Sequence, residues 1–153
     1  MQTTRVLHHI AAPPAAVYRA LLDPTAIASW RVPDDMTAEV HEFEPREGGR
    51  FRVSLSYRNP TRAGKTAGAT DTYHGRFLRL VDNEQVVEEF EFESDSPDLA
   101  GTMTMTTTLT ESEGGTDVLV VHEGLPDTIP AADNELGTRM ALSNLAHLVE
   151  AQP

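Results

Sequence analysis

The sequence predicts an α+β fold in which a curved antiparallel sheet of about six or seven strands wraps around a long C-terminal helix. Short segments after Thr37 alternate apolar and polar side chains, and no segment of helical length separates them, so successive strands are antiparallel. The last segment, Pro130 to Ala151, repeats its apolar residues at helical spacing and needs a sheet to bury them. A chain of 153 residues is the size of one domain, so we expect a single domain over residues 1–153.

The N-terminal segment predicts one strand followed by two short helices. Val6 to Ile10 alternates with the period of a strand, which Pro13-Pro14 stops. Because proline is tolerated in the first helical turn, the same prolines can begin a helix over Ala15 to Leu22. Asp23-Pro24 ends that helix, and Thr25 to Trp30 follows as a second short one.

The middle of the chain consists almost entirely of strand patterns. The segments are Thr37 to Phe43, Arg50 to Tyr57, Thr72 to Val81, Gln85 to Glu93, Thr102 to Thr110 and Asp117 to Glu123. Glu113-Gly114-Gly115 is a strong hairpin signal, and residues 59–70 have the polar composition of a loop. In the C-terminal helix, the stripe expected to face the sheet contains Thr138, Ala141, Leu142, Leu145, Leu148 and Val149.

The composition argues against several classes of function. Lys and Arg number 12 against 24 Asp and Glu, and the formal net charge of -12 disfavours nucleic acid and membrane partners. The absence of cysteine excludes disulfides, thiolate catalysis and cysteine-ligated metal centres. No apolar run is long enough to span a bilayer, and the first residues lack the apolar stretch of a secretory signal. We therefore expect a cytoplasmic protein.

No motif for a cofactor, a metal or a nucleophile is present. The sequence has no glycine-rich phosphate loop, no His-Glu-x-x-His and no Gly-x-Ser-x-Gly. His8 and His9 are adjacent, but neighbouring residues of a strand point to opposite faces, so they are not expected to share a metal. We expect no cofactor and no metal, and whether the protein is an enzyme stays open.

Glu88 is the one charged residue on an otherwise apolar strand face, which it shares with Val86, Phe90 and Phe92. A carboxylate in that position must be paired, raise its pKa, or reach water in a cavity. Two interpretations remain open. Glu88 either lies near a strand end or bonds a buried arginine, for which Arg52 and Arg76 are candidates, or it is a pocket carboxylate that can act as a catalytic base.

Other side chains on inward faces are candidates for a cavity wall. His122 ends an apolar row, where it is either a structural donor or a proton carrier, because its ordinary pKa lies near neutrality. Met103 and Met105 are either core filler or a lining that adapts to varied ligands. Aromatic walls are predicted from Trp30, Tyr73 and Phe77, with plain packing as the alternative.

Short sequence patterns add a resemblance that covers nearly the whole chain. They are Ile10-Ala11-Ala12-Pro13 with Val17-Tyr18, Leu22-Asp23-Pro24 before Trp30, Gly48-Gly49-Arg50-Phe51, Tyr73-His74-Gly75-Arg76-Phe77, Gly115-Thr116 before His122-Glu123-Gly124, and Leu136-Gly137-Thr138-Arg139-Met140-Ala141-Leu142 with Leu145-Ala146. In this order they resemble the SRPBCC (START-like, helix-grip) superfamily, and within it the branch of Hsp90 ATPase activator homologue-like proteins.

The resemblance implies a cavity between the sheet and the C-terminal helix, which the superfamily uses for lipids, polyketides and other apolar molecules. Many members have tryptophan after the helix glycine, whereas Thr138 follows Gly137 here, and Glu88 stands where an aromatic residue is common. Both departures predict a roomier and partly polar cavity. The residues expected to bind the ligand are Trp30, Phe51, Tyr73, Phe77, Glu88, Phe90, Met103, Met105, His122, Thr138 and Leu142.

The fold implied by this resemblance hosts several functions. The first is binding of a small hydrophobic or amphipathic molecule in the cavity. The alternative is a cyclase- or dehydratase-type enzyme on a polyketide-like substrate, with Glu88 or His122 as the acid–base group. A co-chaperone that stimulates a chaperone ATPase is the third. Separately, a second helix stripe predicts a homodimer as an open alternative, and it contains Leu136, Met140 and His147.

Overall fold

A computed structural model describes residues 1–32, 36–57, 70–94 and 97–151. Within these ranges, seven strands form one antiparallel sheet in the order β1-β7-β6-β5-β4-β3-β2. The strands are β1 (Gln2–Ile10), β2 (Met36–Phe43), β3 (Arg50–Tyr57), β4 (Thr70–Val81), β5 (Gln85–Phe92), β6 (Met103–Ser112) and β7 (Gly115–Leu125). The helices are α1 (Pro14–Leu21), α2 (Pro24–Trp30) and α3 (Ala131–Glu150), with a single 3-10 turn η1 (Pro97–Leu99) before β6.

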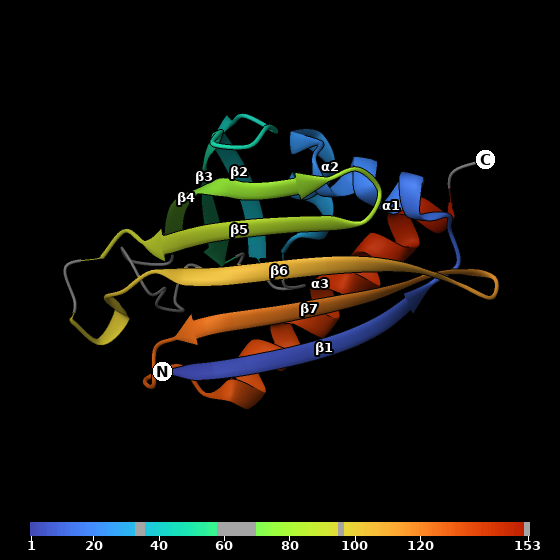
Figure 1. Cartoon of the computed structure of the whole chain (residues 1–153). Coiled ribbons are helices and arrows are strands. Elements are labelled where there is room, and N and C mark those ends of the chain that lie inside the picture. Colours follow the sequence, from blue (N-terminus) through green and yellow to red (C-terminus); the bar gives the residue numbers. More distant parts are fainter. Residues whose placement is uncertain (33–35, 58–69, 95–96, 152–153) are drawn as a thin grey trace.

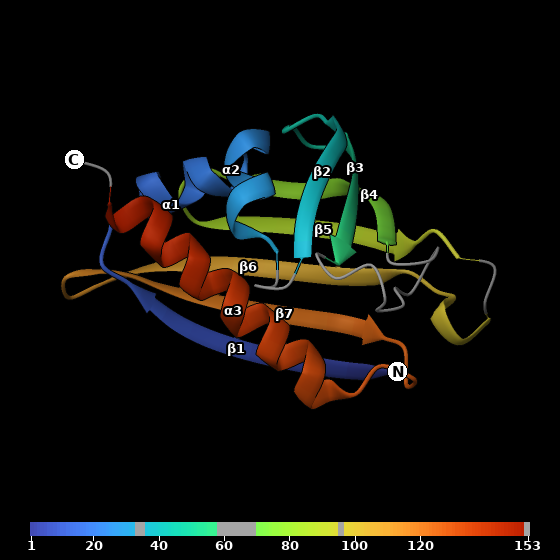
Figure 2. The same cartoon turned by 180° about the vertical axis from the view of Figure 1, so that it is seen from behind.

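The sheet curves around α3, which confirms the predicted α+β helix-grip fold. Figure 1 shows the strands in front of α3, and Figure 2 shows α3 lying across the concave side of the sheet, with α1 and α2 beside it. The face of α3 turned to the sheet buries Leu142, Leu145, Ala146 and Val149. These belong to the apolar stripe that the helical period predicts, apart from Ala146, which lies next to it.

The predicted elements are confirmed, and the differences lie at their ends. β1 begins at Gln2 instead of Val6, because pairing with β7 extends it through residues that lack an apolar pattern. β7 likewise extends beyond its predicted range at both ends. The loop predicted over 59–70 lies outside the described residues, apart from Thr70, which begins β4.

Two features that favour bending of the sheet occur near the middle of β4. A Cβ at Gly75 would collide with the carbonyl oxygen of Glu89 and the Cα of Phe90 on β5, so only glycine permits this close approach. A register shift between Phe77 and Arg79 marks an irregularity in the same pair of strands. Irregularities of this kind bend a sheet and increase its twist. The concave side that results faces α2 and α3.

The two short helices fix the position of the chain where α2 ends. The Asp23 carboxylate accepts a hydrogen bond from the backbone N–H of Thr25 at 2.9 Å and so caps α2. At the other end, the indole Nε1 of Trp30 donates to the carbonyl oxygen of Ala20 at 3.0 Å, which joins α2 to α1 inside the core. The residue after Trp30, Arg31, is therefore held at the edge of the concave face.

Candidate ligand-binding site

Five inward-facing residues form one row across the sheet. The register pairs Thr4 of β1 with His122 of β7, His122 with Met105 of β6, Met105 with Glu88 of β5, and Glu88 with Phe77 of β4. Thr4, Glu88 and His122 are buried, with exposed fractions of 5%, 4% and 8%. Because buried polar groups are costly without partners, each needs a hydrogen-bonding group from elsewhere in the fold.

The partner of Glu88 comes from the end of α2. Nη1 of Arg31 donates to Oε1 of Glu88 at 2.8 Å, and its Nη2 lies 3.8 Å from the sulfur of Met105. The side chains are only 16% and 5% exposed, so the pair is largely removed from water. Burial lowers the pKa of Arg31, but the negative charge of Glu88 and its hydrogen bond to the guanidinium outweigh burial and raise this pKa above its ordinary value.

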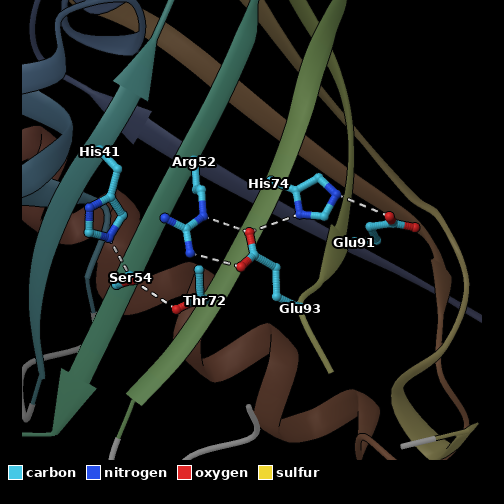
Figure 3. A network of polar contacts seen from close by, with 7 residues as sticks. All are labelled: His41, Arg52, Ser54, Thr72, His74, Glu91 and Glu93. Carbon is cyan, nitrogen blue, oxygen red and sulfur yellow. Dashed lines mark hydrogen bonds and ion pairs between the residues drawn. The ribbon is translucent and has the colours of Figure 1, made fainter. Parts of the chain in front are cut away.

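Two interpretations of Glu88 were open, and the structure agrees with the one in which Glu88 bonds a buried arginine. That arginine is Arg31. The candidates Arg52 and Arg76 were wrong, since they lie on the outer face and bond Glu93 and Glu89. Figure 3 shows Arg52 with Glu93 in a polar network on that outer face. The alternation of β3 and β4 puts their arginines on the side away from Glu88, which leaves a helix end as the source of the partner.

The partner of His122 comes from the first turn of α3. Nδ2 of Asn134 lies 3.1 Å from Nδ1 of His122, and Oδ1 of Asn134 accepts the hydroxyl of Thr4 at 2.6 Å. Since the amide oxygen is used by Thr4, the amide nitrogen is the group turned to the imidazole, and Nδ1 must accept. The imidazole proton is therefore on Nε2.

His122 is neutral at physiological pH. Burial, and after it the nearby positive charge of Arg31, together lower the pKa of its imidazole to about 4. Its Nε2 is buried and has no hydrogen-bond partner. The chain of contacts from Thr4 through Asn134 thus orients a neutral ring and leaves one N–H unsatisfied.

A cavity of about 280 Å³ lies on the concave side, between the sheet, the end of α2 and α3. Its wall is mostly apolar, and its polar groups include Arg31, Asp71, Asn134 and the imidazole of His122. Tyr73 also lines it, and burial raises the pKa of this phenol, so that it keeps its proton. Met105 and His122 from the row across the sheet therefore form part of the cavity wall, together with their neighbours Arg31 and Asn134.

Seven of the residues predicted to bind a ligand are brought together in this wall. They are Trp30, Tyr73, Phe90, Met105, His122, Thr138 and Leu142. Four others are not among the described residues that line it. Phe51, Phe77 and Met103 are packed in the core, with the rings of Phe51 and Phe77 centred 5.2 Å apart, and Glu88 lies behind Arg31. An inward direction on a strand therefore predicts burial, and distance from the helix decides whether the side chain reaches the cavity.

Five polar residues of the wall were not among the predicted site residues, namely Arg31, Asp71, Thr107, Asp133 and Asn134. Arg31 follows a short helix in the sequence, and Asn134 lies in the first turn of α3, with no periodic pattern to single out either one. Asp71 precedes Tyr73 on β4 by two residues, so its inward direction could have been read from strand alternation. Its burial, at 1% exposed, is a property of the packed fold.

Two further observations concern metals and membranes. His9 bonds Asp117 at 2.9 Å on the outer face, while His8 points inward, and among the described residues no group of three or more His, Asp or Glu could hold a metal ion. None of the helices in the described ranges is long and apolar enough to cross a bilayer.

Comparison with known protein families finds one family model that matches most of the chain. The family model of activator of Hsp90 ATPase homolog 1-like proteins matches residues 11–150, from the end of β1 to the last residue of α3. The chain belongs to this family. The resemblance found in the sequence patterns is thereby confirmed, and this activator-homologue family has the helix-grip fold seen here.

Solved structures show the same arrangement. A Chromobacterium violaceum protein is 35% identical, with 98% of each chain covered and a TM-score of 0.88. A Rhodobacter sphaeroides protein is 21% identical over 97% of this chain and 92% of its own, with a TM-score of 0.81. The AHSA1-like protein from Aeromonas hydrophila is 21% identical over 98% and 93%, with a TM-score of 0.73. No curated protein matches the chain.

Proposed function

We propose that this member of the activator-homologue family binds a small hydrophobic or amphipathic molecule in the cavity between the concave face of the sheet and α3. The observation that carries the proposal is the unfilled space of about 280 Å³ with its mostly apolar wall. Protein cores are normally packed to the density of organic crystals, with few voids larger than a water molecule. A space of this size between the sheet and α3 therefore offers room for a small molecule.

The energetics favour a molecule with both apolar and polar parts. Burying roughly 250 Å² of apolar ligand surface stabilises a complex by about 6 kcal/mol before the costs of association. Those costs remove a large share of the gain, so an apolar molecule without polar anchors binds weakly. The polar groups of the wall, among them Arg31, Asn134 and His122, supply such anchors.

Acid–base catalysis by Glu88 or His122 has less support than binding. Glu88 is tied to Arg31 and lies outside the described cavity wall. A base works best when its pKa lies near the operating pH, whereas the pKa of His122 is lowered to about 4. Stimulation of a chaperone ATPase, which the family name suggests, has no particular feature of the described residues behind it and stays a prediction.

Native mass spectrometry after mild purification tests the proposal directly. A retained small molecule would appear as a mass above that of the 16.7 kDa chain, and its own mass would identify its chemical class. The same preparation, stripped of any ligand, is then titrated with a neutral, fluorescent apolar probe such as N-phenyl-1-naphthylamine.

Thr138→Trp provides the matching variant, with Arg139→Trp as its control. Thr138 lines the cavity, whereas Arg139 is the next residue of α3 and is exposed. An indole in the cavity displaces about 60 Å² of ligand contact, so Thr138→Trp is expected to weaken probe binding about tenfold. Arg139→Trp should leave it unchanged. Equal affinities for both variants and the parent protein would contradict a ligand site at this position.

A further inference from the structure

The Nε2–H of His122 is a buried hydrogen-bond donor without an acceptor, in a residue that lines the cavity. The residue is more than nine-tenths buried, and Nε2 has no hydrogen-bond partner, although Nδ1 is bonded to Asn134. A buried donor without an acceptor is costly, and native structures rarely retain one without a reason. Because Asn134 holds the opposite nitrogen of the ring, His122 cannot satisfy Nε2 by exchanging its proton between the two nitrogens.

The charges around the cavity limit what the acceptor can be. Among the described wall residues, Arg31 is the one cation, and its charge is already balanced by Glu88 at 2.8 Å. Two carboxyl-bearing residues, Asp71 and Asp133, also line the cavity. An anionic guest would find no unbalanced positive charge there, and it would meet the carboxylates of the wall. The acceptor is therefore uncharged.

The type of acceptor follows from hydrogen-bond accounting. A guest hydroxyl would bring a donor that must find a second, correctly placed partner in the wall, whereas a carbonyl oxygen accepts only and needs the one donor. Apolar groups adjoin His122 in the wall, with the Phe90 ring centred 5.3 Å from the imidazole and Val120 two residues before it on the same face of β7. An apolar body with one carbonyl oxygen satisfies both features without creating a new unsatisfied group.

We infer that the cavity selects a neutral, apolar molecule that bears a carbonyl oxygen, and that Nε2–H of His122 is the donor that recognises this oxygen. This inference rests on the proposed function, since it specifies the ligand class of the same cavity. Thr4 and Asn134 act as positioning residues, because they hold His122 in the tautomer that carries its proton on Nε2.

Three probes with the same diphenyl body separate the contribution of a carbonyl oxygen from those of apolar contact and of negative charge. Benzophenone, diphenylmethane and diphenylacetate each have two phenyl rings on one carbon. That carbon also bears a doubly bonded oxygen in benzophenone, two hydrogens in diphenylmethane, and one hydrogen and a carboxylate in diphenylacetate. Affinities are measured on the full chain by NMR titration at neutral pH. Benzophenone is expected to bind about tenfold more tightly than diphenylmethane, because only benzophenone satisfies the buried donor. Diphenylacetate should bind most weakly.

His122→Phe removes the donor and keeps an aromatic ring in the row. The advantage of benzophenone over diphenylmethane should then fall to within about twofold. Leu125→Met is the control, since Leu125 also lines the cavity from β7 but carries no polar group, and it should affect all three probes alike. If His122→Phe does not fold, two measurements on the parent protein still test the role of His122. Nitrogen-15 spectra should show a protonated Nε2, and the carbonyl stretch of bound benzophenone should move to lower frequency.

Each result bears on one of the two proposals. Equal affinities for benzophenone and diphenylmethane in the parent protein, tighter binding of diphenylacetate, or a proton on Nδ1 would overturn the assignment of His122. In all three cases binding of the apolar body would leave the cavity itself in place. Binding of none of the probes would contradict the cavity as a ligand site, and the carbonyl assignment would be lost with it.

Discussion

The two faces of the sheet hold similar polar residues in very different surroundings. On the outer face, Arg52, His74, Glu91 and Glu93 bond one another across neighbouring strands, with side chains between 29% and 48% exposed (Figure 3). On the inner face, Glu88 and His122 are almost completely buried, and their partners Arg31 and Asn134 come from helices. Outer groups share several partners and water, whereas each inner group depends on one neighbour.

The contacts on the outer face stabilise the surface of the sheet, whereas those on the inner face orient the residues of the candidate site. Loss of an outer partner can be compensated by water or by another side chain, since Glu93 alone bonds both Arg52 and His74. Loss of an inner partner leaves a buried charge or dipole with nothing to replace it. Inner contacts therefore orient their residues firmly, as a binding site requires, and their removal should cost more.

Breaking the inner ion pair should have the largest effect. Arg31→Met leaves Glu88 buried without its partner and is expected to lower the free energy of unfolding by about 3–5 kcal/mol. The additional change Glu88→Met should recover most of this loss, because the uncompensated charge is then gone. Urea denaturation measures all three proteins. A loss for Arg31→Met no larger than that for an exposed arginine would remove the distinction between the two faces.

The next effect is a dependence of stability on pH that originates at His122. The unfolded imidazole titrates near its ordinary 6.5, whereas burial lowers the folded pKa to about 4. The unfolded state therefore binds more protons within this window, and stability is lost as the pH falls from 6.5 toward 4, by about 3 kcal/mol. His122→Phe should flatten this slope when unfolding is measured at several pH values.

A smaller effect is expected when one hydrogen-bonded chain on each face is interrupted. Asn134→Leu leaves the Thr4 hydroxyl and Nδ1 of His122 without a partner and should cost about 2 kcal/mol. On the outer face, Ser54 joins His41 and Thr72 at 2.8 Å each, and Ser54→Ala should cost about 1 kcal/mol or less, because water can reach His41. Thermal unfolding compares the two; a larger loss for Ser54→Ala would reverse the expected order.

The smallest effect belongs to the exposed ion pair. Arg52→Met breaks two contacts with Glu93, at 2.8 and 2.9 Å, but is expected to lower stability less than the other three changes, since these side chains remain in water. That contribution should shrink further in high salt, which screens exposed charges. Urea denaturation with and without 1 M sodium chloride checks both statements, and a salt-independent loss of several kcal/mol would show that the outer network is not surface-like.

Much of the candidate site follows from patterns that a sequence displays. Strand alternation places Glu88, Met105 and His122 on inward faces, and helical spacing places Thr138 and Leu142 toward the sheet, which is where the structure has them. The same patterns do not separate cavity wall from solid core. Phe51 and Phe77 alternate inward just as Tyr73 does, yet only Tyr73 lines the cavity.

The sequence by itself determined the order of strands and helices, the faces that turn inward and the family to which the chain belongs, because these depend on local periods and short patterns along the chain. Tertiary structure alone decided which partners meet. Arg31 and Glu88 are 57 residues apart, and Thr4 and Asn134 are 130 apart, so no local pattern relates them. Curvature of the sheet and the docking of α2 and α3 bring these groups together, and the same packing leaves the Nε2–H of His122 without a partner.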